Sequence, residues 1–185
     1  PGFRSVVGRY QDALTAVARC LLGAMAEALD LAPDAFDSFL TVPAGALRLV
    51  HYPPRRTAAG ADEFGAGAHT DWGVLTVLAQ DDAGGLQVQA ADGTWLDATP
   101  RPDALVVNIG DLMDRWTNGR FRSTPHRVLG APTDRYSIVL FHDLDWEATI
   151  ECLPTCADAD RPARYPPITV GAHLLQKFEA SVVGA

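Results

Sequence analysis

Seven short segments rich in Val, Leu, Thr and Trp follow one another between residues 46 and 142, separated by Gly, Pro, Asp and Asn. In chain order they read ALRLVHY, WGVLTVLAQ, GLQVQAA, GTWLDAT, ALVVNIG, HRVLGAP and RYSIVLFH. Short strands at this spacing predict an all-β sandwich or barrel rather than alternating βαβ units. The glycine-containing stretches QDDAGGLQV and AADGTWL are expected to be hairpin connections.

Helices are expected on both sides of these strands. Residues 8–30 predict an amphipathic helix whose apolar face carries Ala13, Val17, Leu21, Ala24 and Leu29. Pro33 and Asp34 predict a turn leading to a shorter second helix. The tail TVGAHLLQKFEASVV, residues 169–183, predicts a closing helix capped near Thr169.

The composition limits the kinds of molecule that this protein is expected to bind. The 185 residues are 48% hydrophobic and 21% charged, which is typical of one soluble globular domain. The net charge of −8 and the lack of a Lys/Arg cluster argue against a nucleic-acid-binding protein. The run ALTAVARCLLGAMAEAL is broken by Arg19 and is too short to span a bilayer. We expect a monomer that binds a small molecule and neither nucleic acid nor membrane.

The number of cysteines indicates the cellular compartment in which the protein is expected to work. An odd count of three does not make a disulfide framework, so a reducing, cytoplasmic location is expected. Cys152 and Cys156 could clip a loop or bind a metal, but no second Cys/His pair at zinc-finger spacing accompanies them. The chain begins PGFRS, without a methionine, and we expect it to be part of a longer protein.

The stretch GAHTDWGV places two polar residues directly before an apolar run. His69 and Asp71 stand at i and i+2, so in extended backbone their side chains project to the same side. His126, in STPHRVLG, also stands where a strand begins. Two histidines and one carboxylate form the ligand set of non-haem Fe(II) oxygenases. The alternatives are a chance HxD and a zinc hydrolase, although the helical HExxH of many zinc hydrolases is absent.

A second pair at i and i+2 lies in DRYSIVLF. Arg135 and Ser137 share one strand face, which Val139 and Phe141 continue inward. A guanidinium beside a hydroxyl suits a carboxylate ligand, because Arg binds carboxylates in a bidentate manner. The alternative is a surface arginine beside a strand.

Three further residues can each be interpreted in two ways, as part of a site or as ordinary structural residues. Asp111 could accept a hydrogen bond from a ligand histidine, but a turn residue after a strand is favoured. Trp72 is expected to face away from the metal and to pack in the core. Arg48 shares strand parity with Tyr52; we favour a solvated arginine over a contact with an anionic substrate.

Together these motifs resemble a known family. LRLVHYPP, GAHTDWGVLTVLAQDDAGGLQVQ, WLDATPRPDALVVNIGDLMDRWTNGRFRSTPHRV and RYSIVLFH are similar, in order, to the iron- and 2-oxoglutarate-dependent dioxygenases of the isopenicillin N synthase-like family. The resemblance runs from about residue 44 to residue 179. It implies a mainly β fold, the double-stranded β-helix or jelly roll, with flanking α-helices at both ends. Residues 44–185 would form this domain, and 1–43 the end of a longer N-terminal region.

The resemblance also assigns roles. It implies three iron ligands and three residues that hold 2-oxoglutarate: His69, Asp71 and His126 for Fe(II), and Arg135, Ser137 and Tyr52 for the cosubstrate. The family's NYYP element reads VHYP here, so Val50 replaces the usual asparagine and His51 the first tyrosine. One hydrogen bond to the cosubstrate is therefore expected to be missing.

The implied reaction is the oxidation, most often hydroxylation, of a small organic substrate by O₂, with release of succinate and CO₂. Desaturation and ring closure use the same site. Two alternatives stay open: a 2-oxoglutarate-independent non-haem iron oxidase in which Arg135 and Ser137 hold a substrate carboxylate, and a catalytically incomplete metal-binding jelly-roll fragment.

Overall fold

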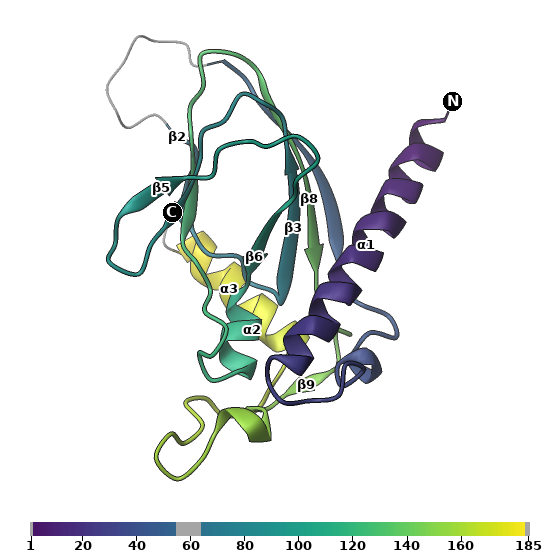
Figure 1. Ribbon diagram of the computed structural model, residues 1–185, viewed down its shortest axis with the longest axis vertical. Helices are drawn as coiled ribbons and strands as arrows, with labels where there is room; N and C mark the ends of the chain where they lie inside the picture. Colours follow the sequence, from purple (N-terminus) through teal and green to yellow (C-terminus); the bar gives the residue numbers. More distant parts are fainter. Residues whose placement is uncertain (1, 55–63, 184–185) are drawn as a thin grey trace.

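The computed structural model of this protein describes residues 2–54 and 64–183. Two four-stranded antiparallel sheets face each other (Figure 1), which confirms the predicted jelly-roll architecture. The first sheet has the order β1 (Ala46–Tyr52), β8 (Arg135–His142), β3 (Leu75–Gln80) and β6 (Val106–Ile109). The second has the order β2 (Phe64–His69), β7 (His126–Leu129), β4 (Leu86–Gln89) and β5 (Trp95–Asp97). A two-stranded sheet of β9 (Thr149–Ile150) and β10 (Ile168–Thr169) lies beyond them.

Helix α1 (Phe3–Glu27) packs alongside β8 and β3, on the outside of the first sheet (Figure 1). The predicted helix is present, although it begins before residue 8 and ends before residue 30, and Leu29 beyond its end is buried. Within the helix, the buried residues are displaced by one position from the predicted apolar face. The helical residues that are buried are Leu14, Ala18, Leu22, Met25 and Ala26. Apolar residues occur on adjacent sides of this segment, so two faces fit the helical period, and the face with the larger side chains is the one buried.

Two hydrophobic clusters hold the layers together. The larger joins α1 to the outer face of the first sheet and includes Leu22, Phe36 and Trp116. The smaller lies between the two sheets and consists of Leu78, Leu86, Val128 and Val139, with Phe141 and Tyr52 packed against it. The prediction that Val139 and Phe141 face inward is therefore confirmed.

One of the two predicted hairpins is wrong. AADGTWL does connect the paired strands β4 and β5, with Gly93 at a φ of 87°. QDDAGGLQV instead carries the chain from β3 in the first sheet to β4 in the second. Its glycines, Gly84 and Gly85, have φ values of 75° and 86°, which are turn conformations needed equally for a hairpin and for a crossing between sheets.

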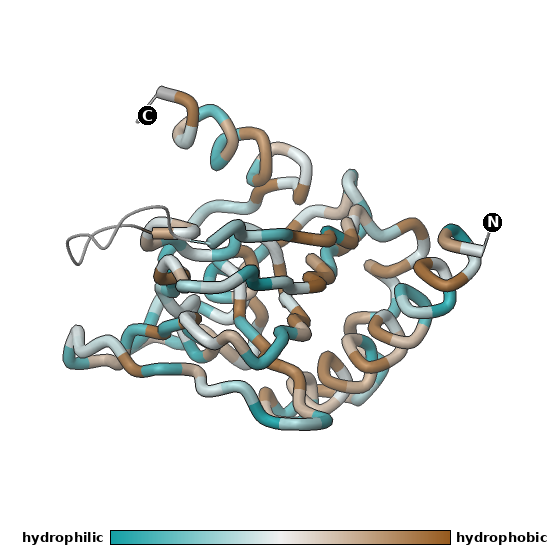
Figure 2. Tube along the Cα trace, turned by 90° about the horizontal axis from the view of Figure 1, so that it is seen from above, coloured by the Kyte–Doolittle hydropathy of each residue, from teal (hydrophilic) through white to brown (hydrophobic). Residues whose placement is uncertain are grey.

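The remaining helices lie near one end of the sheets (Figure 1). Helix α2 (Asp111–Trp116) was not predicted, whereas α3 (Val170–Val183) was, and the Thr169 hydroxyl caps it by accepting a hydrogen bond from the Ala172 N–H at 3.2 Å. Two 3₁₀ turns, η1 (Asp37–Phe39) and η2 (Pro154–Cys156), complete the elements. Seen from above, the N-terminal and C-terminal helices lie on different sides of the strands (Figure 2). None of the helices described is long and apolar enough to cross a membrane.

Candidate active site

The structure brings the three predicted metal ligands together at one end of the second sheet. His69 is the last residue of β2 and His126 the first of β7, and the two are register partners with ring centroids 4.3 Å apart. Asp71 follows two residues later, with Oδ1 3.7 Å from His126 Nε2. One ligand atom from each of the three side chains lies within 4.8 Å of the others, a spacing that can hold one metal ion.

Hydrogen bonds fix both histidine rings in the tautomer that can bind a metal through Nε2. His69 donates from Nδ1 to the Gly67 carbonyl at 2.7 Å, and His126 donates from Nδ1 to the Thr124 carbonyl at 3.1 Å. A carbonyl only accepts, so each ring carries its proton on Nδ1 and leaves the Nε2 lone pair free. Asp71 is 5% exposed, and its Oδ2 has no hydrogen-bond partner in the part of the chain described. This donor set therefore fits Fe(II), which would satisfy the unpaired oxygen.

A buried cation lies between the two sheets. Arg135, at the start of β8, is 0% exposed, and it donates from Nε to the Gly84 carbonyl at 2.7 Å and from Nη2 to Gln80 Oε1 at 3.2 Å. Its Nη1 and the hydroxyl of Ser137 are buried without any partner among the described residues. An unpaired guanidinium nitrogen beside an unpaired hydroxyl lacks an anionic acceptor, and a carboxylate supplies one.

Tyr52 lies beside Arg135, and we call Arg135, Ser137 and Tyr52 together the cradle. Tyr52 is the register partner of Arg135 on β1, and its ring centroid lies 4.9 Å from the Arg135 guanidinium carbon. Val50 faces Ser137 in the same register, where the family's asparagine would stand. His51 stacks on Tyr136 on the solvent side and pairs with Asp134 at 2.6 Å, away from the cradle. The strand register thus gathers all three residues predicted for the cosubstrate; their binding role stays a prediction.

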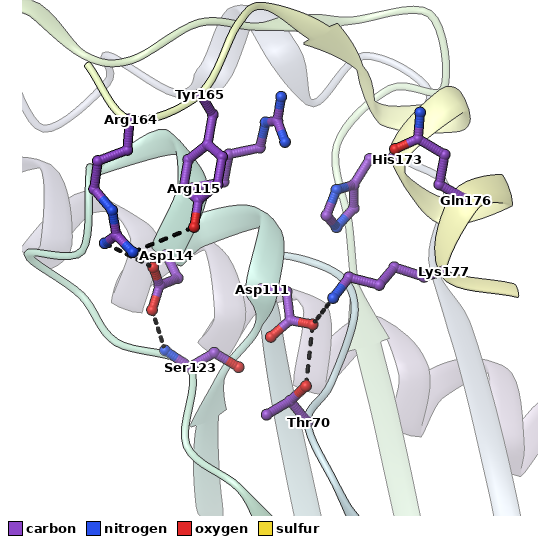
Figure 3. Close-up of a pocket in the computed structure, with 10 residues that line it drawn as sticks. All are labelled: Thr70, Asp111, Asp114, Arg115, Ser123, Arg164, Tyr165, His173, Gln176 and Lys177. Carbon is purple, nitrogen blue, oxygen red and sulfur yellow. Dashed lines mark hydrogen bonds and ion pairs between the residues drawn. The ribbon is translucent and has the colours of Figure 1, made fainter. Parts of the chain in front are cut away.

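A cleft of about 420 Å³ is lined by polar and charged residues, among them Thr70, which stands between His69 and Asp71 in the chain (Figure 3). Asp111 begins α2, and its Oδ2 accepts hydrogen bonds from the Thr70 hydroxyl at 3.0 Å and from Lys177 Nζ at 2.6 Å. His173 of α3 donates to the Trp72 carbonyl at 2.9 Å. Asp111 is therefore the first residue of a helix rather than a turn residue, and it ties α3 to the loop between His69 and Asp71.

A separate cavity of about 470 Å³ opens on the metal ligands His69 and Asp71. Trp72 lines this cavity and is half-buried, so the prediction that it packs in the core away from the metal is wrong. The chain leaves strand geometry after His69, so parity no longer decides where position 72 points. Leu174 and Ser181 of α3 close one wall. These two residues carried no recognisable sequence signal, because they come from a helix far along the chain.

Asp143 also lines this cavity and was missed by the sequence interpretation. It directly follows β8, as Asp71 follows a strand, and this similarity was an available signal. Its Oδ1 accepts the Val74 N–H at 2.9 Å, and a Cβ at Gly73 would overlap its carboxylate. Burial raises the pKa of Asp143 to about 6, and the Asp71 carboxylate adds to the effect.

This pKa predicts how stability depends on pH in metal-free protein. The folded state holds the Asp143 proton up to about pH 6, whereas the unfolded chain releases it near its ordinary pKa of 3.8. The free energy of unfolding should therefore fall between about pH 4 and 6, by up to about 3 kcal/mol from this group. Asp143→Asn keeps the acceptor for Val74 and should remove that step, as measured by urea unfolding with a chelator present.

The exposed Asp12→Asn is the matched control and should keep the parent's pH profile. A profile of Asp143→Asn that still falls with the parent's slope would show that another group produces the step.

Comparisons with known proteins identify the family of this chain. The family model described as "2OG-Fe(II) oxygenase superfamily" matches residues 43–144. The chain is 40% identical over 173 residues to the 2-oxoglutarate-Fe(II) type oxidoreductase hxnY of Emericella nidulans, which covers 91% of the chain and 49% of that protein. It is 42% identical over 146 residues to the 2-oxoglutarate-dependent dioxygenase citB of Monascus ruber, covering 76% of the chain and 44% of that protein. The chain spans about half the length of these curated relatives.

A solved structure shares the fold. A full-length protein of Neurospora crassa, crystallised in complex with alpha-KG and thymine, superimposes with a TM-score of 0.91 at 36% identity, over 97% of this chain and 57% of that chain. Fe(II) and 2-oxoglutarate, the cofactors of the matched family, suit the donor set and the cationic cradle. By sequence and by fold, the chain belongs to the 2OG-Fe(II) oxygenase superfamily.

Proposed function

We propose that this chain carries the catalytic portion of a non-haem Fe(II)- and 2-oxoglutarate-dependent dioxygenase that oxidises, and most often hydroxylates, a small organic substrate. One oxygen atom of O₂ would enter the product and the other would enter succinate, with release of CO₂. The observation that carries the proposal is a set of three buried atoms without partners among the described residues: Asp71 Oδ2, Arg135 Nη1 and Ser137 Oγ. A bound metal ion would satisfy the first of these atoms, and a bound anion would satisfy the other two.

In this proposal His69, Asp71 and His126 hold Fe(II). Bound Fe(II) supplies the redox chemistry with O₂, and the chain supplies orientation and exclusion of water. Arg135 and Ser137 bind the distal carboxylate of 2-oxoglutarate, and the Tyr52 ring lies against that guanidinium. Because Arg135 is fully buried, the pair forms out of water, which strengthens the electrostatic attraction.

The proposal also covers the kind of substrate, the cellular compartment and the oligomeric state. The Neurospora crassa structure contains thymine, which supports a small and free substrate for this chain as well. All three cysteines, Cys20, Cys152 and Cys156, are free, which supports a reducing compartment such as the cytoplasm. The net charge of −8 supports a small-molecule substrate over a nucleic acid, and we propose a monomer.

The test is cosubstrate binding followed by turnover. Anaerobic addition of 2-oxoglutarate to the Fe(II)-loaded chain should give the weak visible charge-transfer band of a keto acid chelated to iron. Admission of O₂ should then produce succinate in proportion to the 2-oxoglutarate consumed. Protein that binds Fe(II) but gives neither the band nor succinate would favour the 2-oxoglutarate-independent oxidase instead.

A further inference from the structure

The cavity that opens on His69 and Asp71 combines an apolar wall with one cationic side chain and with the Asp143 carboxylate. Its apolar residues come from the start of β1 and the segment before it, from the loop between β2 and β3, from β8 and from α3: Ala44, Ala46, Trp72, Phe141 and Leu174. Arg48 is the only Lys or Arg among the described residues that line it. At about 470 Å³ the cavity has the size of a site for a small organic ligand.

Strand geometry directs Arg48 into this cavity. Arg48, Val50 and Tyr52 alternate along β1 on one side, and the latter two pack against the cluster between the sheets. Arg48 is the register partner of Val139, and its guanidinium carbon lies 5.2 Å from the centroid of the Phe141 ring. The guanidinium of Arg48 therefore lies over the face of the Phe141 ring, within the range of a cation–π contact.

The N–H groups of Arg48 have no hydrogen-bond acceptor within the described chain. No hydrogen bond or ion pair joins Arg48 to the rest of the described chain, and its side chain is exposed at the cavity mouth. Other arginines of the two sheets are held: Arg127 donates to Gln87 Oε1 at 2.8 Å, and Arg135 donates to the Gly84 carbonyl at 2.7 Å. Among the described lysines and arginines, Arg48 alone lines this cavity, and its N–H groups have no hydrogen-bond partner in the described chain.

We propose that Arg48 is the specificity-determining residue of the substrate pocket, and that the substrate is a compact, flat molecule carrying a carboxylate. This inference rests on the proposed function, because it places the oxidised carbon of that substrate in the cavity with His69 and Asp71. A guanidinium binds a carboxylate through two parallel N–H donors, and Arg48 stands in this cavity with such donors unpaired among the described residues. The ring of Phe141 and the indole of Trp72 offer aromatic walls to a flat body.

The test compares carboxylates with their neutral isosteres. Benzoate, phenylacetate and indole-3-acetate, and the three matching carboxamides, are titrated by calorimetry into anaerobic protein saturated with Mn(II) and 2-oxoglutarate. With the metal and Arg135 already occupied, the parent should bind at least one carboxylate more tightly than its carboxamide. Arg48→Gln should weaken that carboxylate by roughly ten- to hundredfold and leave the carboxamide unchanged. Arg101→Gln, an exposed arginine outside the cavity, is the matched control and should behave as the parent does.

The outcomes of these titrations distinguish a failure of the proposed function from a failure of the role of Arg48. A parent that fails to bind Mn(II) and 2-oxoglutarate overturns the proposed function. A parent that binds both, but prefers the carboxamides or takes neither series at millimolar concentration, overturns the role of Arg48 alone. Unchanged carboxylate affinity in Arg48→Gln does the same. Parent-like affinity of Arg48→Gln for 2-oxoglutarate is expected, and it would show that the variant is folded and that the loss is confined to the substrate pocket.

Discussion

Asp71→Ala is expected to abolish tight Fe(II) binding. Asp71 supplies the only carboxylate of the three-ligand cluster, so its loss removes both one of three protein contacts and the only negative charge of the cluster. His69→Ala and His126→Ala remove one neutral ligand each and should also prevent tight binding. Anaerobic calorimetric titration with Fe(II) or Mn(II) measures the effect, with the melting temperature of metal-free protein as a check on folding.

The control for this series is His51→Ala. His51 lies on the solvent side of β1, stacked on Tyr136, and should leave metal affinity unchanged. Divalent metal should raise the melting temperature of the parent and of this control, by an amount that corresponds to about 2.7 kcal/mol at a hundred times the dissociation constant. Stoichiometric metal binding that persists in Asp71→Ala would remove Asp71 from the assignment.

Strand periodicity made much of this site predictable from the sequence. Arg135 and Ser137 alternate on one strand, and β8 forms over the predicted residues, so both side chains reach the interior as expected. The same rule was applied to His69 and Asp71, but only His69 belongs to a strand. The approach of His69 to His126 depends instead on the register of β2 with β7, which pairs these two residues from distant segments of the chain.

The strand β2 itself was missed for a local reason. Its sequence is FGAGAH, whose glycines and alanines have low strand propensity and show no alternation of apolar and polar side chains. The strand exists because its backbone pairs with β7, and a Cβ at Gly65 would crowd the Tyr52 ring. Tertiary packing, rather than propensity, thus determines this half of the metal site.

The cavity that opens on His69 and Asp71 was the least predictable part. Its wall combines Arg48 of β1, Phe141 of β8 and Leu174 of α3, whose approach follows from topology and from the contacts that fix α3. One such contact, Lys177 with Asp111, joins two helices of which only α3 was predicted. Short motifs therefore predict the candidate metal and cosubstrate residues, whereas the wall of this cavity depends on long-range packing.

Arg135→Ala is expected to weaken 2-oxoglutarate binding by roughly two to three orders of magnitude. Arg135 is 0% exposed and has one nitrogen without a partner in the described chain, so the cosubstrate carboxylate would be its ion pair. Removal of one member of a buried pair costs about 3–5 kcal/mol, because the other charge stays buried and unpaired. Ser137→Ala removes a single hydrogen bond to the same carboxylate and should cost only about 0.5–3 kcal/mol.

Titration of Fe(II)-loaded protein with 2-oxoglutarate, followed by the charge-transfer band, measures both losses. Iron affinity should stay at the parent value in both variants, because Arg135 and Ser137 do not belong to the metal-ligand cluster. Arg135→Lys keeps the charge but loses the bidentate geometry, so its affinity should fall between the parent and Arg135→Ala. The matched control is Tyr136→Ala, an exposed neighbour on the same strand, which should bind the cosubstrate as the parent does. If Arg135→Ala binds 2-oxoglutarate as tightly as the parent, the cradle is not the cosubstrate site, and an oxidase whose substrate carboxylate occupies it becomes the better explanation of the unpaired nitrogen.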